Sequence, residues 1–228
     1  QLNLDKTAYR KLTSVKWNKK VQGLHELAEL QLFVPDVKML ELTNSRNRVL
    51  RMEARAAYIQ LSKNEPFKFF NSIREPMLEW EQLYLFEVIT KTRNLVIPSF
   101  SRWLNYSSNP WIIIFCLKLI EHYNQFNTVP SVMKLLDHAD PKVRAAAINA
   151  LGKLEATEAE DKLAAMYIDQ PVFCQVEILK AFGRIRSNRQ LPFLQEEFLR
   201  SQDYEIRKNA ARSIIEHGNQ AKEMIADL

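Results

Sequence analysis

Apolar residues recur along this chain at the spacing of an α-helix that buries one face. The clearest example is the segment 140–154, which reads Asp-Pro-Lys-Val-Arg-Ala-Ala-Ala-Ile-Asn-Ala-Leu-Gly-Lys-Leu. An Asp before a helix can accept hydrogen bonds from backbone N–H groups of the first turn, and a Pro fits that turn because it needs no N–H partner. The pattern therefore predicts a capped helix with one buried face.

The same pattern returns at intervals of about 31 residues. One column of apolar positions contains Leu50, Glu81, Ile112, Val143, Cys174 and, after one inserted residue, Ile206. Glu81 is the weak member of this column because it is charged. The column four residues later holds mostly small side chains, which let neighbouring helices approach closely: Gly23, Ala54, Leu85, Cys116, Ala147, Ile178 and Ala210. These columns predict seven equivalent helices, which we call the first helices.

A shorter apolar-periodic segment follows each first helix. These segments are 35–43, 66–74, 98–106, 130–138, 159–167, 190–199 and a final stub from Asn219. A first helix, a turn and a second helix form a hairpin that can bury its apolar faces only by stacking on its neighbours. The sequence therefore predicts an all-α fold, an α-solenoid of six to seven helical hairpins.

The hairpins are expected to form one domain over residues 1–228. Residues 1–15 are expected to be an N-terminal cap or a juxtamembrane segment. The repeats are expected near 16–44, 46–75, 77–107, 110–138, 140–169, 171–200 and 203–228.

The segment 140–154 resembles the first helix of a HEAT repeat, with shorter echoes at 50–57 and 206–211. This resemblance implies an armadillo-like α-solenoid whose second helices line a concave side. The chain also resembles bacterial HEAT-repeat proteins that carry an N-terminal membrane anchor, through Leu4-Asp5-Lys6-x-x-Tyr9-x-Lys11-Leu12 and the following Trp17. That resemblance implies a cytoplasmic location, or the cytoplasmic face of a membrane through an anchor upstream of Gln1.

Composition agrees with a helical chain that buries a core. Of the 228 residues, 46% are hydrophobic and only 4 are Gly. No apolar run approaches the about 20 residues that span a bilayer, since the densest run, 111–120, is broken by Lys118. Cys116 and Cys174 fall on first helices two repeats apart, so we expect two separate buried thiols rather than a disulfide.

Positive charge is concentrated in the N-terminal half. The formal net charge is +5, and residues 1–114 contain 17 Lys and Arg against 11 Asp and Glu. Lys16, Lys19 and Lys20 are predicted to form an electrostatic contact with a protein, with an anionic membrane surface or with a nucleic acid. A solvated helix face is the simpler explanation of the same residues.

Groups suited to catalysis are scattered along the sequence. The four histidines lack the close spacing of a zinc site, and the chain has neither a Gly-rich phosphate loop nor a Gly-x-Ser-x-Gly elbow. We expect no catalytic residue, no metal and no cofactor. The alternative is a DNA glycosylase built from HEAT-like repeats, for which the available residues are Trp80, Trp103, Trp111, Arg102, Glu79 and Glu81.

The outward column of the second helices is predicted to be Met39, Phe70, Arg102, Lys134, Ala165 and Glu196. Nucleic-acid binding requires a basic stripe, but this column passes from apolar to basic to acidic, as mixed protein interfaces do. The sequence therefore predicts a non-enzymatic scaffold or adaptor that binds a protein, with nucleic-acid binding as the alternative. The predicted groove residues are Met39, Phe70, Arg102 and Lys134.

Overall fold

The computed structural model describes residues 4–32, 34–63 and 65–218, and these residues contain helices but no strand. The chain divides into two compact units, Gln1–Pro98 and Ser99–Leu228, called here unit 1 and unit 2. The all-α prediction is confirmed. The single domain expected from the sequence stays a prediction, and the stub from Asn219 lies outside the described residues.

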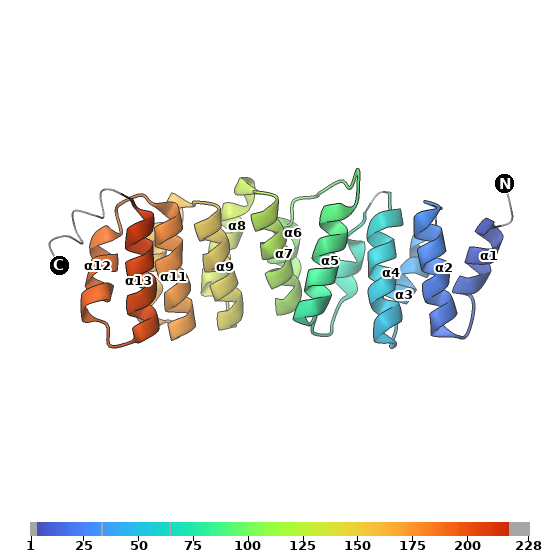
Figure 1. Ribbon diagram of the computed structural model, residues 1–228, viewed down its shortest axis with the longest axis horizontal. Helices are drawn as coiled ribbons and strands as arrows, with labels where there is room; N and C mark the ends of the chain where they lie inside the picture. Colours follow the sequence, from blue (N-terminus) through green and yellow to red (C-terminus); the bar gives the residue numbers. More distant parts are fainter. Residues whose placement is uncertain (1–3, 33, 64, 219–228) are drawn as a thin grey trace. The chain divides into compact units, whose positions relative to one another are not determined.

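Unit 1 is a stack of antiparallel helical hairpins (Figure 1). Its first helices α2, α4 and α5 stand side by side, and α3 packs against α4 while α1 packs against α2. The elements are α1 (Leu4–Leu12), α2 (Trp17–Glu29), α3 (Asp36–Thr43), α4 (Arg48–Leu61), the 3₁₀ helix η1 (Lys68–Ser72) and α5 (Glu79–Lys91).

Unit 2 continues the alternation of long first helices and short second ones. Its first helices are α7 (Pro110–His122), α9 (Pro141–Lys153), α11 (Val172–Ile185) and α13 (Tyr204–Glu216), and each packs against the next. Its second helices are α6 (Ser101–Tyr106), α8 (Val129–Lys134), α10 (Glu160–Met166) and α12 (Leu191–Arg200). Short 3₁₀ helices flank them: η2 (Phe126–Thr128), η3 (Leu135–Asp137), η4 (Thr157–Ala159) and η5 (Tyr167–Asp169).

Polar side chains start several first helices, as the Asp-Pro pattern predicts. Oδ1 of Asp140 accepts a 2.8 Å hydrogen bond from the backbone N–H of Lys142, and Asp203 caps α13 in the same way. Asn47 and Asn109 cap α4 and α7. These bonds satisfy N–H groups that have no partner within the helix.

The arginine of the HEAT-like pattern has a structural role in three repeats. Arg51, Arg144 and Arg207 each donate from Nη1 to the backbone carbonyl oxygen six residues earlier, at 2.7 Å, 2.8 Å and 2.8 Å. Each of these bonds ties a first helix to the end of the preceding second segment. The arginine therefore fixes the turn between the two helices of neighbouring hairpins.

Small residues let the first helices approach closely in unit 2. A Cβ atom added to Gly152 of α9 would lie 2.7 Å from Cα of Ala181 in α11. Cys116 and Cys174 are buried free thiols, as predicted. Burial raises the pKa of the Cys116 thiol well above its ordinary value, so this thiol is held in its neutral form.

One predicted second helix differs from expectation. Segment 66–74 contains the 3₁₀ helix η1 in place of an α-helix. Phe67, Phe69 and Phe70 are all buried, and the Phe69 ring packs edge-on against Tyr58 of α4 with 5.8 Å between ring centroids. These three rings anchor segment 66–74 in the core of unit 1.

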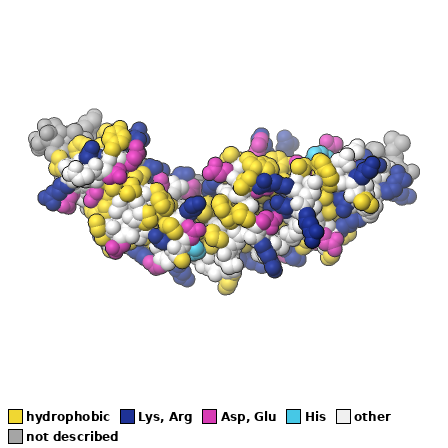
Figure 2. All heavy atoms as spheres, turned by 90° about the horizontal axis from the view of Figure 1, so that it is seen from below, with side chains coloured by type: hydrophobic (Ala, Val, Ile, Leu, Met, Phe, Trp, Pro, Cys, Tyr) yellow, Lys and Arg dark blue, Asp and Glu magenta, His cyan; other side chains and the backbone are white. Residues whose placement is uncertain are grey.

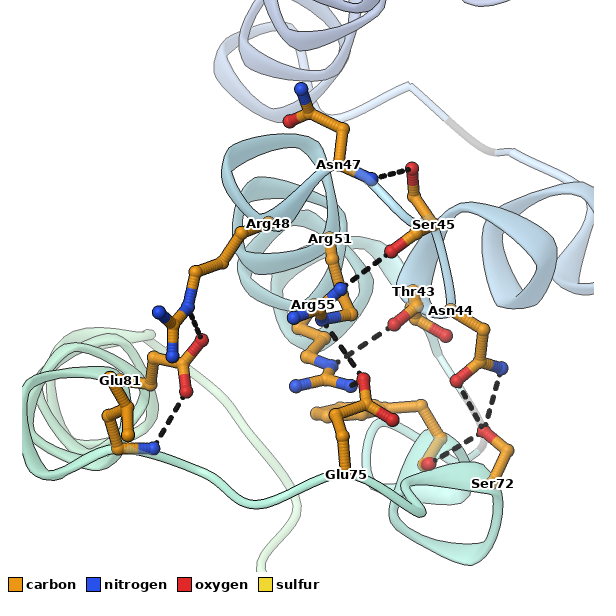
Figure 3. A network of polar contacts seen from close by, with 12 residues as sticks. Thr43, Asn44, Ser45, Asn47, Arg48, Arg51, Arg55, Ser72, Glu75 and Glu81 are labelled. Atoms are coloured by element: carbon orange, nitrogen blue, oxygen red, sulfur yellow. Dashed lines mark hydrogen bonds and ion pairs between the residues drawn. The ribbon is translucent and has the colours of Figure 1, made fainter.

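A buried arginine joins the hairpins of unit 1 (Figure 3). Arg55 is 1% exposed; its Nε donates to the carbonyl oxygen of Thr43 at 3.1 Å, and its Nη2 donates to Oε1 of Glu75 at 3.1 Å. Arg51 lies 3.0 Å from the same Glu75 oxygen. Burial lowers the pKa of the Arg55 guanidinium to about 10, although the charge of Glu75 acts in the opposite direction.

Candidate functional site

A row of exposed side chains runs across the second helices of unit 2. Arg102 of α6, Lys134 of α8, Ala165 of α10 and Glu196 of α12 are all exposed. Three large apolar side chains are exposed on the same elements: Tyr106, Ile168 and Leu199. We call these seven residues the second-helix surface.

The exposure of the first four follows from where each helix begins. Lys134, Ala165 and Glu196 are each the sixth residue of their helix, and Arg102 is the second residue of α6. Residues four positions apart differ by about 40° around an α-helix. Equivalent positions on consecutive helices predict that the four side chains leave the same side of their helices.

Polar pairs tie the second helices of consecutive repeats together. Nζ of Lys162 lies 2.6 Å from Oδ2 of Asp137, and the hydroxyl of Tyr167 donates to Oε2 of Glu197 at 2.8 Å. Burial, together with that carboxylate, raises the pKa of Tyr167 far above its ordinary value, so the hydroxyl remains a donor. The second-helix surface is therefore held in register before any partner arrives.

The charge of the second-helix surface changes sign along its length. Arg102 and Lys134 make the α6 and α8 end positive, whereas Glu196 and Asp169 place carboxylates toward the other end, where Oε1 of Glu196 lies 2.6 Å from Nη1 of Arg200. Tyr106 is 87% exposed and Ile168 is 79% exposed, so both offer apolar area to a partner. The guanidinium of Arg102 lies 5.7 Å from the ring centroid of Trp103, a contact that favours one position of its charge.

Met39 and Phe70 do not belong to an exposed surface, and their prediction as groove residues is wrong. Each side chain is only 2% exposed and packs in the core of unit 1. Met39 is the fourth residue of α3, whereas Arg102 is the second residue of α6. A difference of two positions turns a side chain by about 200° around a helix. Phe70 lies in the 3₁₀ helix η1 among buried aromatic rings.

The predicted basic contact residues lie at the start of α2. Lys16 directly precedes this helix, Lys16 and Lys19 are exposed, and Lys20 is half-buried. Lys19 also lines a hollow of about 630 Å³ with Arg10 and Lys11. Lys11 forms an ion pair with Glu26, so part of the positive charge beside this hollow is neutralised.

Most of the residues available to a glycosylase pack against neighbours or form polar pairs. Trp103 is buried against Phe100, with 5.8 Å between ring centroids, and Trp111 is half-buried near the start of α7. Trp80 and Glu79 are exposed at the start of α5. Burial raises the pKa of Glu81, but hydrogen bonds from Arg48 and from the Leu78 N–H outweigh it and leave the value below the ordinary one. Glu81 therefore stays ionised and is unsuited to act as a general acid.

His25 meets a carboxylate that the hydrophobic pattern does not predict. Nε2 of His25 in α2 lies 2.8 Å from Oε2 of Glu53 in α4, and the Tyr84 hydroxyl of α5 donates to the same oxygen at 3.0 Å. Glu53 thus links three first helices beside a hollow of about 740 Å³. Glu53 and Tyr84 directly precede Ala54 and Leu85 in the repeat alignment, whereas His25 lies two residues after Gly23, so the alignment alone does not reveal the cluster.

Neither a group of metal ligands nor a membrane-spanning helix is found among the described residues. Within the described residues, no three His, Cys, Asp or Glu side chains are grouped so that they could hold a metal ion. In the same part of the chain, no helix is both long enough and apolar enough to cross a membrane.

The stacked hairpins define an α-solenoid, and comparison with known proteins finds a similar repeat family for part of it. Residues 97–173 match the family of HEAT repeats. No curated protein matches the chain significantly. The chain is also similar to the crystal structures of two engineered proteins. The first is 15% identical with a TM-score of 0.40, and the match covers 95% of this chain and 97% of that protein. The second is 16% identical with a TM-score of 0.49, and the match covers 100% of this chain and 72% of that protein. The described part of the chain is an all-helical solenoid, and its residues 97–173 are similar to HEAT repeats.

Proposed function

We propose that the chain is a non-enzymatic scaffold that binds an extended protein segment across the second-helix surface of unit 2. The observation that carries this proposal is the exposed row itself, in which charge changes sign from Arg102 and Lys134 to Glu196. A repeat scaffold suits protein interaction because it offers an extended surface without a dedicated pocket. The expected location, in the cytoplasm or at the cytoplasmic face of a membrane, stays a prediction.

The distribution of charge specifies the partner. A carboxylate of the bound segment would meet Arg102 and Lys134, and a Lys or Arg would meet Glu196. Lys134 and Glu196 are two repeats apart, or about 20 Å at the usual spacing of packed helices. An extended chain covers that distance with roughly six residues. Apolar side chains of the segment would pack on Ile168, with Tyr106 and Leu199 toward the two ends.

The surface is suited to binding because little of it must be ordered on association. The Asp137–Lys162 and Tyr167–Glu197 pairs already hold neighbouring second helices in register. Exposed Tyr and Arg side chains are also the types most often found at the energetic centre of protein interfaces. Preorganisation of this kind reduces the entropy lost when a partner binds.

Selection of peptides from a displayed library tests the proposal. We expect enriched peptides with acidic and basic residues about six positions apart and apolar residues between them. These peptides should bind an Arg102→Glu/Lys134→Glu variant at least 10-fold more weakly, because two attractions become repulsions.

The matched control is Lys142→Glu/Arg212→Glu, which makes the same change of charge at exposed positions on the first helices α9 and α13. The control should retain wild-type affinity. Equal loss in the two variants would contradict binding at the second-helix surface, as would enriched peptides with no charge pattern.

A further inference from the structure

The starts of the first helices in unit 1 form an edge where cations alternate with exposed apolar side chains. We call it the basic edge and define it by Val15, Lys16, Trp17, Arg46, Val49, Arg74, Leu78 and Trp80. Figure 2 views the molecule from the side on which these helix starts lie, and it shows yellow apolar side chains interspersed with blue Lys and Arg.

The apolar members recur at matching positions of the repeat. Val49 and Trp80 are the second residues of α4 and α5, and Trp17 is the first residue of α2. Trp17 is 46% exposed and Trp80 is 49% exposed, while Val15 is fully exposed. Neighbouring helices pack in the order α2, α4, α5, so these side chains form a row along the edge.

Each loop that leads into this row supplies an exposed cation. Lys16 precedes α2, Arg46 precedes α4 and Arg74 precedes α5. The carboxylates nearby are mostly engaged: Glu75 pairs with Arg51 and Arg55, and Glu81 pairs with Arg48. The positive ends of the helix dipoles lie at the same edge and act in the same direction as the cations.

The position of Trp80 is set by its neighbour. The Arg48 guanidinium lies 5.4 Å from the centroid of the Trp80 ring while its Nε donates to Glu81. This guanidinium therefore has its charge balanced by a buried carboxylate and serves as a platform for the indole. The indole stays half exposed at the edge in a defined position.

The corresponding starts in unit 2 provide an internal contrast. Phe173 and Tyr204 are exposed apolar side chains at the same register of α11 and α13. The loops before the first helices of unit 2, residues 107–109, 138–140, 170–171 and 201–203, contain no Lys or Arg, and they contribute Asp140 and Asp203. The loops that lead into the first helices thus carry cations in unit 1 but not in unit 2, whose Lys142 and Lys208 lie within α9 and α13.

We propose that the basic edge docks on an anionic lipid bilayer. Trp17 and Trp80 would sit at the depth of the headgroups, where amphipathic aromatic rings are favoured, and Lys16, Arg46 and Arg74 would meet lipid phosphates. The aliphatic side chains of Val15, Val49 and Leu78 decide between lipid and nucleic acid. They gain nothing from stacking on bases, but they gain from burial at the boundary of the acyl chains.

Vesicle binding by the 228-residue chain tests this proposal directly. We expect sedimentation with vesicles that contain phosphatidylserine, little sedimentation with pure phosphatidylcholine vesicles, and a loss of binding at high salt. Tryptophan emission should shift to shorter wavelength on binding. A Trp17→Phe/Trp80→Phe variant should lose this shift, because the two remaining tryptophans, Trp103 and Trp111, belong to unit 2 and not to the basic edge.

Charge reversal on opposite ends of the same helices supplies a matched control. Arg46→Glu/Arg74→Glu changes the residues before α4 and α5, whereas Lys63→Glu/Arg93→Glu changes exposed residues after the same two helices. The first variant should bind anionic vesicles at least 10-fold more weakly, and the second should bind within about twofold of wild type. Circular dichroism melting confirms that both variants are folded.

Several outcomes would overturn lipid docking at this edge. These are equal binding to neutral and anionic vesicles, equal loss in the two charge-reversal variants, and binding of single-stranded DNA in preference to vesicles. An unchanged emission spectrum on vesicle binding would also count against it. The Arg102→Glu/Lys134→Glu variant should retain vesicle binding, so failure of the protein-binding proposal and failure of this one are distinguishable.

Discussion

Nε of Arg48 in α4 donates a 2.8 Å hydrogen bond to Oε1 of Glu81 in α5, and Glu81 is 1% exposed. The second carboxylate oxygen, Oε2, accepts from the backbone N–H of Leu78 at 2.7 Å, which satisfies a donor at the start of α5. Glu81 occupies a column whose other members from the second repeat onward are apolar: Leu50, Ile112, Val143, Cys174 and Ile206. The pair therefore replaces an apolar contact between neighbouring first helices with a polar one.

The two partners of this pair should respond differently to substitution. Arg48→Met leaves a buried carboxylate with one remaining donor, so we expect a clear loss in the free energy of unfolding. Glu81→Leu restores the apolar column and leaves only an exposed guanidinium, so its cost should be below about 1 kcal/mol. Urea denaturation measures both. If both variants lost the same free energy of unfolding, the Glu81 carboxylate would have to be in contact with water rather than buried.

Stability should fall in acid because of Glu75 and Glu81. Burial acts to raise the pKa of each carboxyl, but hydrogen bonds and neighbouring guanidinium charges outweigh it and leave both values below the ordinary range. A carboxyl whose pKa is lower in the folded state stabilises the protein above its unfolded pKa of about 4.3, and that contribution disappears as the pH falls through the folded value.

The urea concentration at the midpoint of unfolding should therefore decrease when the pH is lowered below about 4. A Glu75→Gln/Glu81→Leu variant should show a shallower drop over the same pH range. Parallel pH profiles for the variant and the wild type would assign the acid sensitivity to other carboxyls.

The buried charge of Arg55 makes Glu75 important at neutral pH as well. Glu75→Gln removes the counterion of a guanidinium that is 1% exposed, so we expect a loss of roughly 2 kcal/mol. Glu65→Gln is the matched control, because Glu65 and Lys68 are an exposed pair 3.7 Å apart whose loss should cost less than about 0.5 kcal/mol. Adding Arg55→Met to Glu75→Gln should recover part of the loss. No recovery would show that packing, rather than charge, makes Arg55 important.

The sequence predicted the first helices well because their pattern is redundant. Each combines a start signal, two aligned columns and a fixed interval, and the structure contains all seven, from α2 to α13. The second helices begin at different distances from the prolines that align them: α3 begins one residue after Pro35 and α6 begins three residues after Pro98. A shift of two residues turns a side chain to the opposite face. The alignment therefore put the exposed Arg102 and the buried Met39 in one column.

The polar contacts between repeats could not be predicted in the same way. The Arg48–Glu81 and His25–Glu53 contacts join residues 33 and 28 positions apart, and such pairing depends on side-chain reach across helices that the hydrophobic pattern does not encode. The basic edge shows the same limit. By sequence alone, Trp80 is one of the aromatic residues available to a glycosylase. Its exposure on the same edge as Arg46 and Arg74 depends on how the starts of the helices lie in space.

Gly152 should resist replacement even by the best helix former. Alanine in place of glycine favours a helix by about 1 kcal/mol, but a Cβ atom at this position would lie 2.7 Å from Cα and 2.9 Å from Cβ of Ala181. The closer atom belongs to the backbone of α11, so the two helices would have to separate. We therefore expect Gly152→Ala to destabilise unit 2 by about 1 to 3 kcal/mol. Ala181→Gly in the same chain should relieve only part of this cost, because the Cα clash remains. Thermal melting of the single and double variants measures the effect, and a higher melting temperature for Gly152→Ala would contradict the close approach of α9 and α11.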